Sequence, residues 1–583
     1  MKTFKSFILS MLLLQAGVFA QAQYKWENPC NQTFQVVRGQ AFCDELKGTY
    51  VRLPDRAKDK VREPVWNLSR QSAGLSISFY SNAPEIKVRY KVNGGFAMPH
   101  MPSTGVSGVD LYAQDINGKQ RWCGFRFSFN DTITYAFSGL TYDTDPKKGY
   151  EYQLFFPLYN SVSWMEIGVP ADASFSFIPA SQEKPIVIYG TSIAQGACAS
   201  RPGMAWGNII ERTLQHPVVN LGFSGNGKLE PELFDLLSEI DAQLYMIDCM
   251  PNLPGDTDSK VIYERTLAGV KKLRKKSQAP ILLVEHAGYT NEFSSESTKR
   301  SYQLANIELK KAYETLQKEA VSNIYYLTKE ELGLCMDATV EGVHPNDLGM
   351  QQYADGYIRK IREILHEENQ NLSTGTPCKQ HRDPYDWNSR HEAVLQLNKE
   401  NAPEVLLIGN SITHFWGGKP EGHTPIGKDS WDKLFKGKQV CNLGFGWDKI
   451  ENILWRIYHG ELDGYQAKDI VALIGTNNLQ SNTDEEIIQG ISTIIEAIQQ
   501  RQPIARLCIL GIYPRKGMEG RIKQFNDKLK KKLTGKRVTY LDMASYFTHK
   551  DGSINWNLFS DGLHPTKEGY TQIAKGLKEN FFK

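Results

Sequence analysis

The sequence predicts an α/β protein: two three-layer α/β/α domains with parallel sheets, preceded by an all-β sandwich. Three observations support this fold class. Residues 24–182 hold short segments of alternating apolar and polar residues, separated by Gly, Asn, Asp and Pro, which is typical of a sandwich. Residues 183–368 alternate short apolar strands with amphipathic helical stretches, a pattern that favours a parallel sheet covered by helices. The same succession returns in residues 385–583.

The first residues predict a secretory signal peptide. Lys2 and Lys5 precede an apolar run from Phe7 to Ala20, and small residues at its end offer cleavage sites. The run is too short and wrongly flanked for a stable membrane span, although a single N-terminal anchor is the alternative. We therefore expect residues 1–22 to be removed, the protein to be periplasmic or secreted, and no integral membrane segment to remain after cleavage.

Composition excludes several classes of partner. The formal charge is +3 with 23% charged residues, so we expect no nucleic-acid partner. There is no C-x-x-C pair and no zinc spacing, so we expect neither a metal nor an organic cofactor. Nine cysteines in an exported chain permit disulfides, and the candidate pairs are Cys198 with Cys249 and Cys30 with Cys43.

Two segments carry no evident chemistry. The sandwich shows no catalytic set, so packing or contact with carbohydrate is the role that we expect of it. Residues 369–384, between the two α/β halves, are polar and broken by Pro and Gly, which predicts a linker.

The same ordered set of motifs occurs in both halves. The first copy reads GTSIAQG, DCMPN and EGVHP; the second reads GNSITHFWGG, GTNN and DGLHP. The serine and the histidine are also separated by nearly the same number of residues in the two copies. Matching order and spacing indicate duplicated domains with related sites.

The first copy contains the residue types of a serine nucleophile site. Ser192 follows a predicted strand in a Gly-flanked loop, His344 is the candidate base, and Glu341 can orient its ring. The backbone N–H groups of Ser192 and Gly225 and the amide of Asn252 are candidate donors to a developing oxyanion.

The second copy fills the same roles with one unusual residue. Ser411, Asp561 and His564 are the candidate nucleophile, acid and base, and Asn477 is the oxyanion amide. Trp447 stands where the first copy has an oxyanion glycine. Its backbone N–H survives, but a left-handed or tightly packed turn would resist tryptophan. The indole could instead line an acyl or sugar pocket.

These blocks resemble the SGNH (GDSL-type) hydrolases, an esterase superfamily whose acid and base share one D-x-x-H turn. The first half is similar to bacterial members with a GxDLY β-domain, through GVDLY, FPLYNSV, YGTSIAQGACASRPG and NLGFSGNG. The second half resembles the catalytic-subunit family of platelet-activating-factor acetylhydrolase, through ILWRIYHGEL, GTNN, RQP, LGIYPR and DGLHP.

Four positions depart from the family pattern. Thr191 and Asn410 replace the Asp before each serine, and Glu341 replaces the Asp of the D-x-x-H turn, with Asp337 as a substitute acid. The second glycine block, NxGxGGD in the family, is NLGFGWD here, which places Trp447 at the oxyanion glycine.

The resemblance implies an exported serine esterase with two active sites that removes O-acetyl groups from complex glycans, so an acetylated polysaccharide is the expected partner. A lipid or short-acyl esterase is the alternative enzyme. A glycan-binding protein with one or both hydrolase sites vestigial is the alternative from another class.

Five further aromatic side chains have two alternative roles. They either line the two sites or pack the neighbouring loops. The five are His414, Trp416 and His423 near Ser411, and His286 and Tyr289 after a predicted strand of the first half. For His286 we favour a buried, hydrogen-bonded role.

Overall fold

The computed structural model describes residues 23–141, 149–367, 373–381, 385–422 and 425–582. The predicted signal peptide and His423 lie outside the described residues. Within them, none of the helices combines the length and the apolar content that crossing a bilayer requires.

The N-terminal part is a sandwich of two antiparallel sheets, with strand orders β1-β10-β4-β8-β7 and β11-β3-β9-β5-β6, and β2 paired with β3. Alternation drives the fold: in β4, every second side chain is buried between the sheets. The strands are β1 (Tyr24–Glu27), β2 (Val37–Arg38), β3 (Ser76–Ser81), β4 (Glu85–Val92), β5 (Asp110–Gln114), β6 (Gln120–Cys123), β7 (Arg126–Ser128), β8 (Ile133–Ser138), β9 (Tyr150–Phe155), β10 (Val162–Pro170) and β11 (Phe175–Ile178).

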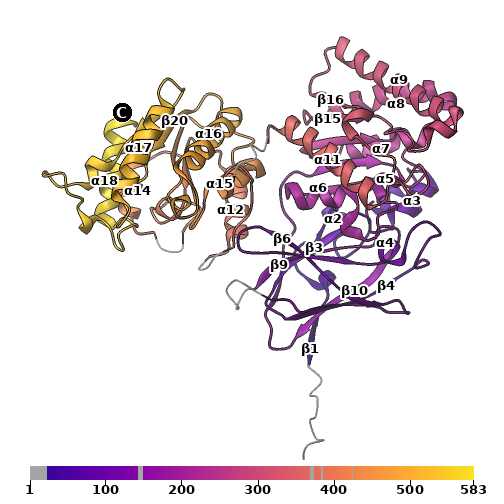
Figure 1. Ribbon diagram of the computed structural model, residues 1–583, viewed down its shortest axis with the longest axis horizontal. Helices are drawn as coiled ribbons and strands as arrows, with labels where there is room; N and C mark the ends of the chain where they lie inside the picture. Colours follow the sequence, from indigo (N-terminus) through magenta and orange to yellow (C-terminus); the bar gives the residue numbers. More distant parts are fainter. Residues whose placement is uncertain (1–22, 142–148, 368–372, 382–384, 423–424, 583) are drawn as a thin grey trace, which may run out of the picture.

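One stretch inside this part leaves the sandwich. It contains α2 (Cys43–Leu46) and α3 (Glu63–Ser69), and α4 (Ser103–Val106) follows later in the chain. Apolar residues between Phe42 and Val65 join the core of the first α/β domain instead of the core between the two sheets. The first two domains therefore share buried surface, and Figure 1 shows the sandwich directly below the first α/β domain.

The first α/β domain is a parallel sheet of order β13-β12-β14-β15-β16. Alternate residues of β12 enter different cores: Ile186 and Ile188 pack with α6 and α11, and Val187 and Tyr189 pack with α7, α8 and α9. Helices therefore cover both faces. The elements are β12 (Ile186–Gly190), α5 (Ser192–Gln195), α6 (Trp206–Leu214), β13 (Val218–Gly222), α7 (Pro231–Leu237), β14 (Leu244–Asp248), α8 (Gly255–Arg274), β15 (Ile281–Val284), α9 (Glu296–Lys318), β16 (Ile324–Leu327), α10 (Lys329–Leu332) and α11 (Asp347–Leu365).

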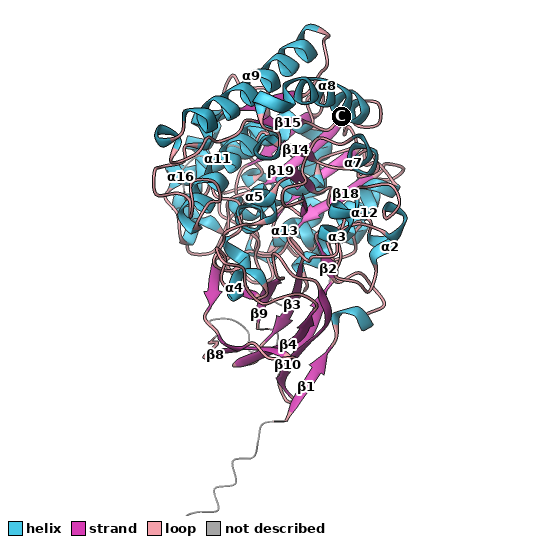
Figure 2. Ribbon diagram, turned by 90° about the vertical axis from the view of Figure 1, so that its right-hand side faces the viewer, coloured by secondary structure: helices cyan, strands magenta, loops and turns pink. Residues whose placement is uncertain are grey.

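The second α/β domain repeats this topology, with order β18-β17-β19-β20-β21. Its two cores again divide the residues of an interior strand, β17. The elements are α12 (Trp387–Glu400), β17 (Val405–Gly409), α13 (Ser411–His414), α14 (Lys428–Leu434), β18 (Val440–Gly444), α15 (Ile450–Arg456), β19 (Asp469–Leu473), α16 (Asp484–Arg501), β20 (Arg506–Leu510), α17 (Glu519–Leu533), β21 (Thr539–Leu541) and α18 (Lys567–Asn580). The two sheets and the sandwich confirm the predicted fold class (Figure 2).

The described part of the predicted linker, residues 373–381, packs against both neighbours. Thr374 is fully buried and donates to the Glu486 carbonyl of the second α/β domain at 3.0 Å. His381 lies 2.9 Å from a carboxylate oxygen of Glu151 in β9 of the sandwich. The segment therefore connects the sandwich to the second α/β domain by contact as well as by chain continuity.

The cysteine pairing proposed from the sequence is not formed, because all nine cysteines are free thiols. Cys249 Sγ donates to the Tyr189 carbonyl at 3.7 Å, whereas Cys198 lies beside two histidine side chains. Cys43 Sγ donates to a backbone carbonyl of its own turn at 3.0 Å. The two cysteines of each proposed pair contact different neighbours, because long-range packing decides which side chains meet.

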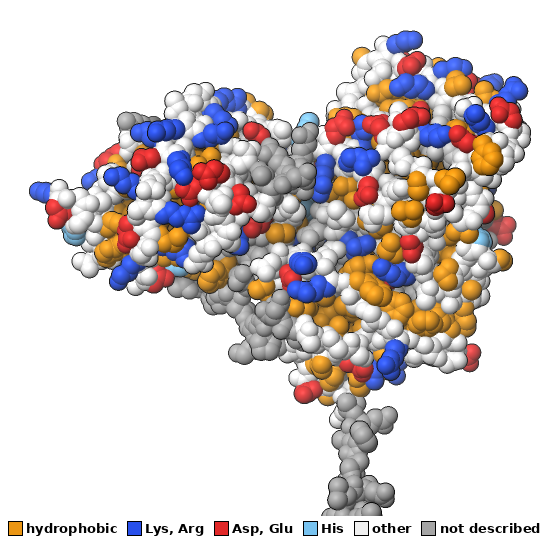
Figure 3. Space-filling view, in the orientation of Figure 1, with side chains coloured by type: hydrophobic (Ala, Val, Ile, Leu, Met, Phe, Trp, Pro, Cys, Tyr) orange, Lys and Arg blue, Asp and Glu red, His pale blue; other side chains and the backbone are white. Residues whose placement is uncertain are grey.

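The surface mixes both signs of charge on the face drawn in Figure 3.

Candidate active sites

Both candidate nucleophiles lie directly after an interior strand of their sheet, the second of five. Ser192 follows β12 as the first residue of α5, and Ser411 follows β17 as the first residue of α13. The residue before each serine caps the short helix, because Thr191 Oγ1 and Asn410 Oδ1 accept the backbone N–H two residues on, at 3.3 and 3.0 Å. The substitutions at these two positions therefore keep a capping acceptor.

In the first α/β domain, the predicted serine, histidine and acid form one hydrogen-bonded chain. Ser192 Oγ lies 2.9 Å from His344 Nε2. His344 Nδ1 is hydrogen-bonded to Glu341 Oε1 on its other side. The longer glutamate side chain thus reaches the ring from three residues upstream. Asp337, the alternative acid, offers its backbone carbonyl to Asn346 at 2.7 Å.

The second domain has the same chain with an aspartate. Ser411 Oγ lies 2.8 Å from His564 Nε2, and His564 Nδ1 lies 2.7 Å from Asp561 Oδ2. The other oxygen of Asp561 accepts the backbone N–H of His564 at 2.7 Å. Partial burial raises the pKa of Asp561, but these hydrogen bonds outweigh burial and lower it below its usual value. The carboxylate is therefore ionised when it orients the ring.

The loops after β13 and β18 are fastened in the same way. Asn220 donates its amide to the Ala194 carbonyl at 2.7 Å, and Asn442 donates to the Thr413 carbonyl at 2.9 Å. Each of these asparagines also accepts the N–H of the glycine two residues on, at 2.8 Å. Both loops are thereby fixed against the helix that begins with the serine.

Gly225 and Trp447 occupy the same backbone position in the two loops. Their φ angles are +69° and +68°, in the left-handed region that favours glycine. The second site therefore does contain the left-handed turn that the sequence suggested would resist tryptophan. The turn is not tightly packed, since Trp447 is 55% exposed. A Cβ added at Gly225 would meet no atom within 4 Å.

The two candidate oxyanion amides are held by these loops. Asn252 Oδ1 accepts the Gly227 N–H at 3.1 Å, which leaves its NH₂ group to face an oxyanion. Asn477 donates one N–H to the Asp448 carbonyl at 2.9 Å, and its second N–H remains to serve the same purpose.

The sandwich supports the first site directly. Tyr159 donates its hydroxyl to the Ser192 carbonyl at 3.2 Å. Asp110 of the GVDLY motif is buried, forms an ion pair with Arg201 and accepts the Gly203 N–H at 3.0 Å. These contacts fasten the loop that follows the serine helix. The GVDLY motif was recognised in the sequence, but nothing there indicated that Asp110 would contact Arg201.

The remaining flagged aromatic side chains pack. His286 is buried, accepts the Gly288 N–H at 2.9 Å and packs at a tilt against Tyr289; burial, helped by Lys329, lowers its pKa to about 3. Trp416 is buried in the second domain, and His414 Nδ1 accepts the Gly446 N–H at 3.2 Å. Of these side chains, His414 therefore supports the oxyanion loop, although it does not line a site.

Family models match all three folded parts of the chain. Models described as the GDSL-like lipase/acylhydrolase family match residues 183–362 and 407–572, and a model of the N-terminus of Esterase_SGNH_hydro-type matches residues 24–175. Human platelet-activating factor acetylhydrolase IB subunit alpha2 is 34% identical over 198 residues, 33% of this chain and 82% of that protein. The human alpha1 subunit is 32% identical over 216 residues, 36% of this chain and 89% of that protein. The chain belongs to the GDSL-like lipase/acylhydrolase family.

A solved structure agrees with this assignment. A protein from Bacteroides ovatus, described as a GDSL-like lipase, is 30% identical with a TM-score of 0.54, and the match covers 59% of this chain and 98% of that one. The predicted tandem family resemblance is thus confirmed, and this GDSL-like acylhydrolase is a carboxylic-ester hydrolase.

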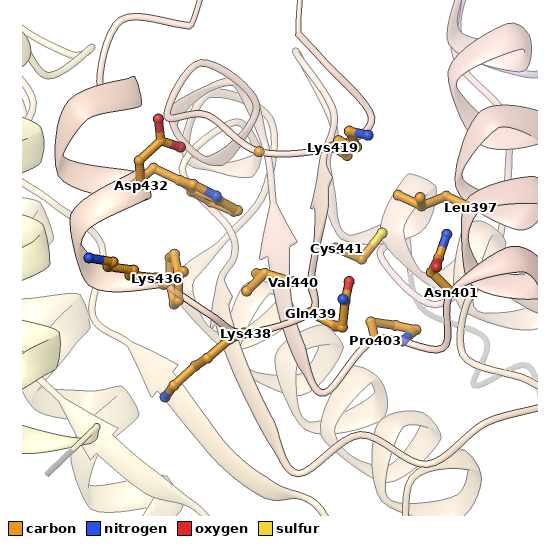
Figure 4. Close-up of a pocket in the computed structure, with 13 residues that line it drawn as sticks. Leu397, Asn401, Pro403, Lys419, Asp432, Lys436, Lys438, Gln439, Val440 and Cys441 are labelled. Atoms are coloured by element: carbon orange, nitrogen blue, oxygen red, sulfur yellow. The ribbon is translucent and has the colours of Figure 1, made fainter.

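Two cavities of this GDSL-like acylhydrolase lie away from the serines. One, of about 470 Å³, is formed by the end of α12, by α14 and by the start of β18, at the opposite end of the sheet from Ser411 (Figure 4). The other, of about 550 Å³, lies between the sandwich and α12. Neither is lined by a candidate catalytic residue, and substrate chemistry belongs at the carboxyl ends of the strands.

Among the described residues, two groups of side chains have metal-ligand character. His100, Cys198 and His344 offer ligand atoms within 4.8 Å of one another, as do Glu183, His216 and His459. The first group shares the histidine of the first site, and burial raises the pKa of the Cys198 thiol to about 12. In the second group, both ring nitrogens of His459 face backbone carbonyls, at 2.6 and 3.1 Å. Internal contacts account for both groups, and no step of the ester chemistry requires them to bind an ion.

Proposed function

We propose that this esterase removes O-acetyl groups from complex glycans and that both α/β domains are active. The observation that carries the proposal is the pair of complete chains, Ser192–His344–Glu341 and Ser411–His564–Asp561. A glycan-binding protein with vestigial sites would have no reason to keep two such chains in hydrogen-bonding geometry.

Each site would act by acyl transfer to serine. The histidine removes the proton from serine Oγ, which attacks the ester carbonyl carbon, and the oxyanion is held by the loop N–H and the asparagine amide. The protonated histidine then gives the proton to the departing sugar oxygen. Water, deprotonated by the same histidine, attacks the acyl-enzyme, and acetate leaves as serine regains its proton.

The openness of both sites supports a bulky substrate. The acid side chains are 42% exposed at Glu341 and 54% at Asp561, so the acid end of each chain faces solvent, although Ser192 and Ser411 are themselves buried. A polymer can approach such a site from solvent. Lipases that bind long acyl chains need an enclosed apolar groove instead.

A short-acyl phospholipid esterase is the second candidate. The named activity of the acetylhydrolase subunits, at 34% and 32% identity, favours it, and acetyl groups would be removed in either case. Acetate release from an acetylated glycan against that from an acetylated phospholipid separates these two candidates, and activity that rises steadily toward long acyl esters would exclude the glycan proposal.

The test is acetate release from acetylated xylan, pectin and sialoglycans by the parent, Ser192→Ala, Ser411→Ala and the double variant. Each single change is expected to remove part of the activity, and the double change all of it. If Ser192→Ala changed no rate on any substrate, the first site would not be an active esterase.

Export is part of the proposal. The N-terminal signal sequence supports it, and a glycan substrate would be met outside the cytoplasm. Mass spectrometry of the protein from the periplasm or medium of an expressing cell should find the N-terminus near residue 23. A protein that stays in the cytoplasm with residues 1–22 attached would contradict this part.

A further inference from the structure

Trp447 is the least expected side chain near either serine. It holds the left-handed φ of +68° that the equivalent Gly225 holds at +69°, and its large ring is 55% exposed. Left-handed backbone is unfavourable for a bulky residue, and an exposed indole gains little from burial. The fold of the loop does not require either of these two unfavourable features, because glycine forms the same turn in the first site. A backbone outlier of this kind points toward function.

The neighbouring peptide groups of Trp447 are clamped from several directions. The Gly446 carbonyl accepts hydrogen bonds from Gln380 Nε2 at 2.8 Å and from the Tyr385 hydroxyl at 2.9 Å. On its other side, the Gly446 N–H donates to His414 at 3.2 Å. The clamp therefore fixes the backbone before Trp447 through side chains that come from other segments of the chain.

Asp448, on the other side of Trp447, is held equally firmly. This buried carboxylate accepts from Trp387 Nε1 and from Arg456 Nε, both at 2.8 Å, and from Gln380 at 3.2 Å. With both neighbours fixed, the loop keeps its left-handed residue whatever side chain that residue carries. The indole is thus presented at the surface by a rigid loop.

The position of the indole limits what it can contact. Its own backbone N–H is the proposed oxyanion donor, so the ring begins two bonds from the Cα of the residue that would hold the scissile ester. The acetyl group is too small to require a contact surface as large as the indole ring. The larger alcohol part of the ester must lie toward solvent, where the exposed ring is.

We propose that Trp447 is a stacking platform for a sugar ring of the acetylated substrate at the second site. A pyranose ring has an apolar C–H face and a polar edge, which match an amphipathic indole that is half in solvent. The inference rests on the proposed function and deepens it. The first site has open space at Gly225 instead, so the two sites select different sugar positions.

The test compares two substrates in the Ser192→Ala background, where only the second site acts. Trp447→Gly and Trp447→Asn should lower the ratio of kcat/KM for the best acetylated glycan to that for 4-nitrophenyl acetate by about tenfold or more, mainly through KM. Trp447→Phe should restore most of the ratio. Asparagine tolerates left-handed backbone, so it separates loss of the ring from increased flexibility of a glycine loop.

The reciprocal variant is Gly225→Trp in the Ser411→Ala background. The matched φ and the open space predict that it folds and lowers the KM of the first site for the same glycan. Equal losses on both substrates in Trp447→Gly and Trp447→Asn would show that the residue only shapes the oxyanion loop. An unchanged ratio in both variants would also overturn the proposal.

A binding measurement distinguishes failure of the platform from failure of the proposed function. The Ser192→Ala, Ser411→Ala double variant is titrated calorimetrically with oligosaccharides of xylan, pectin and sialoglycans. Because the first site can bind glycan as well, each titration is fitted for the number of sites and their affinities. Loss of one binding site in Trp447→Gly would support the platform even if the parent released no acetate. If no oligosaccharide binds, or if Trp447→Gly changes neither the number of sites nor their affinities, the platform is wrong, whatever the outcome of the acetate assay.

Discussion

Glu341 occupies, against the His344 ring, the place that Asp561 occupies against His564. In both turns the acid lies three residues before the histidine, accepts its backbone N–H and is hydrogen-bonded to Nδ1. The extra methylene of glutamate is accommodated although the Glu341 side chain is less exposed than that of Asp561, at 42% against 54%. The acid replacement in the first copy therefore preserves the hydrogen bonds of the turn.

The contact between Glu341 and His344 predicts a large effect of removing the carboxylate. In the Ser411→Ala background, Glu341→Gln should lower kcat by about 10³-fold or more, because the ring loses the partner that fixes its tautomer. Asp337→Asn is the matched control and should change kcat little, since Asp337 offers only a backbone carbonyl. Steady-state kinetics on an aryl acetate measure both kcat values. A larger loss of kcat in Asp337→Asn than in Glu341→Gln would make Asp337 the acid.

Asp110 of the sandwich should matter to one site only. Asp110→Asn removes a buried charge that faces Arg201 and turns one of the two oxygens that accept from Trp122 Nε1 and the Gly203 N–H into an NH₂ donor, so the loop after Ser192 should lose its order. We expect kcat/KM of the first site to fall by about tenfold or more. The second site of the same protein is the internal control, measured in the Ser192→Ala background. Equal losses at both sites would indicate general unfolding.

The left-handed backbone of Trp447 predicts a gain in stability on substitution. Trp447→Gly should raise the free energy of unfolding by about 1 kcal/mol, because glycine adopts this conformation without strain. Gly225→Ala, at the matched position, should lower it by a similar amount. Differential scanning calorimetry of both variants measures the effect. A fall in stability for Trp447→Gly would mean that the indole packs more than its exposure indicates.

Buried histidines between the two α/β domains predict a dependence of stability on pH. Burial lowers the pKa of His216, but the carboxylates of Glu367 and Glu183 outweigh it and raise the pKa to about 10. Likewise Glu183 and Glu461 raise the pKa of His391 to about 9 against the effect of burial. Both values exceed the ordinary value of about 6.5, so this stabilisation is complete below pH about 6.5 and is lost as pH rises through 9 to 10.

Thermal unfolding at a series of pH values tests this sign. The Tm of the parent should fall between pH 8 and 10 more steeply than that of His216→Asn, which carries no titrating ring at this place. The buried carboxylate of Glu183 has its pKa held well below the usual range, since His459, His216 and His391 outweigh the effect of burial. The stabilisation of the fold by the ionised Glu183 carboxylate is therefore retained down to acid pH. Parallel curves for the parent and the variant would contradict the assignment.

Local motifs were enough to predict each catalytic chain. The acid and the base lie three residues apart in one turn, and the serine follows the carboxyl end of a buried parallel strand, so the short-range pattern nearly fixes their geometry. The left-handed position of Trp447 was also open to prediction, because the glycine block of the first copy occupies the same place. The exposure of its indole was not, since exposure depends on what the rest of the fold brings to the loop.

The contacts between domains had no local signal. Gln380 looked like part of a polar linker, yet it is buried and fixes the loop that carries Trp447. Tyr159 lies in a segment recognised only as a family marker, and its hydroxyl reaches the Ser192 carbonyl from the sandwich. Both pairs are far apart in the chain, so no periodicity or spacing could have joined them.

By itself the sequence determined the duplication, the fold class and the candidate residues of the two Ser–His–acid chains, because strand pattern and motif spacing are properties of neighbouring residues. The tertiary structure decided how the sites differ. It placed the sandwich against the first serine, the linker against the second oxyanion loop, and an exposed indole where the first site has open space. These differences arise from side chains that meet only after distant segments pack, so they are fixed by the folded chain as a whole.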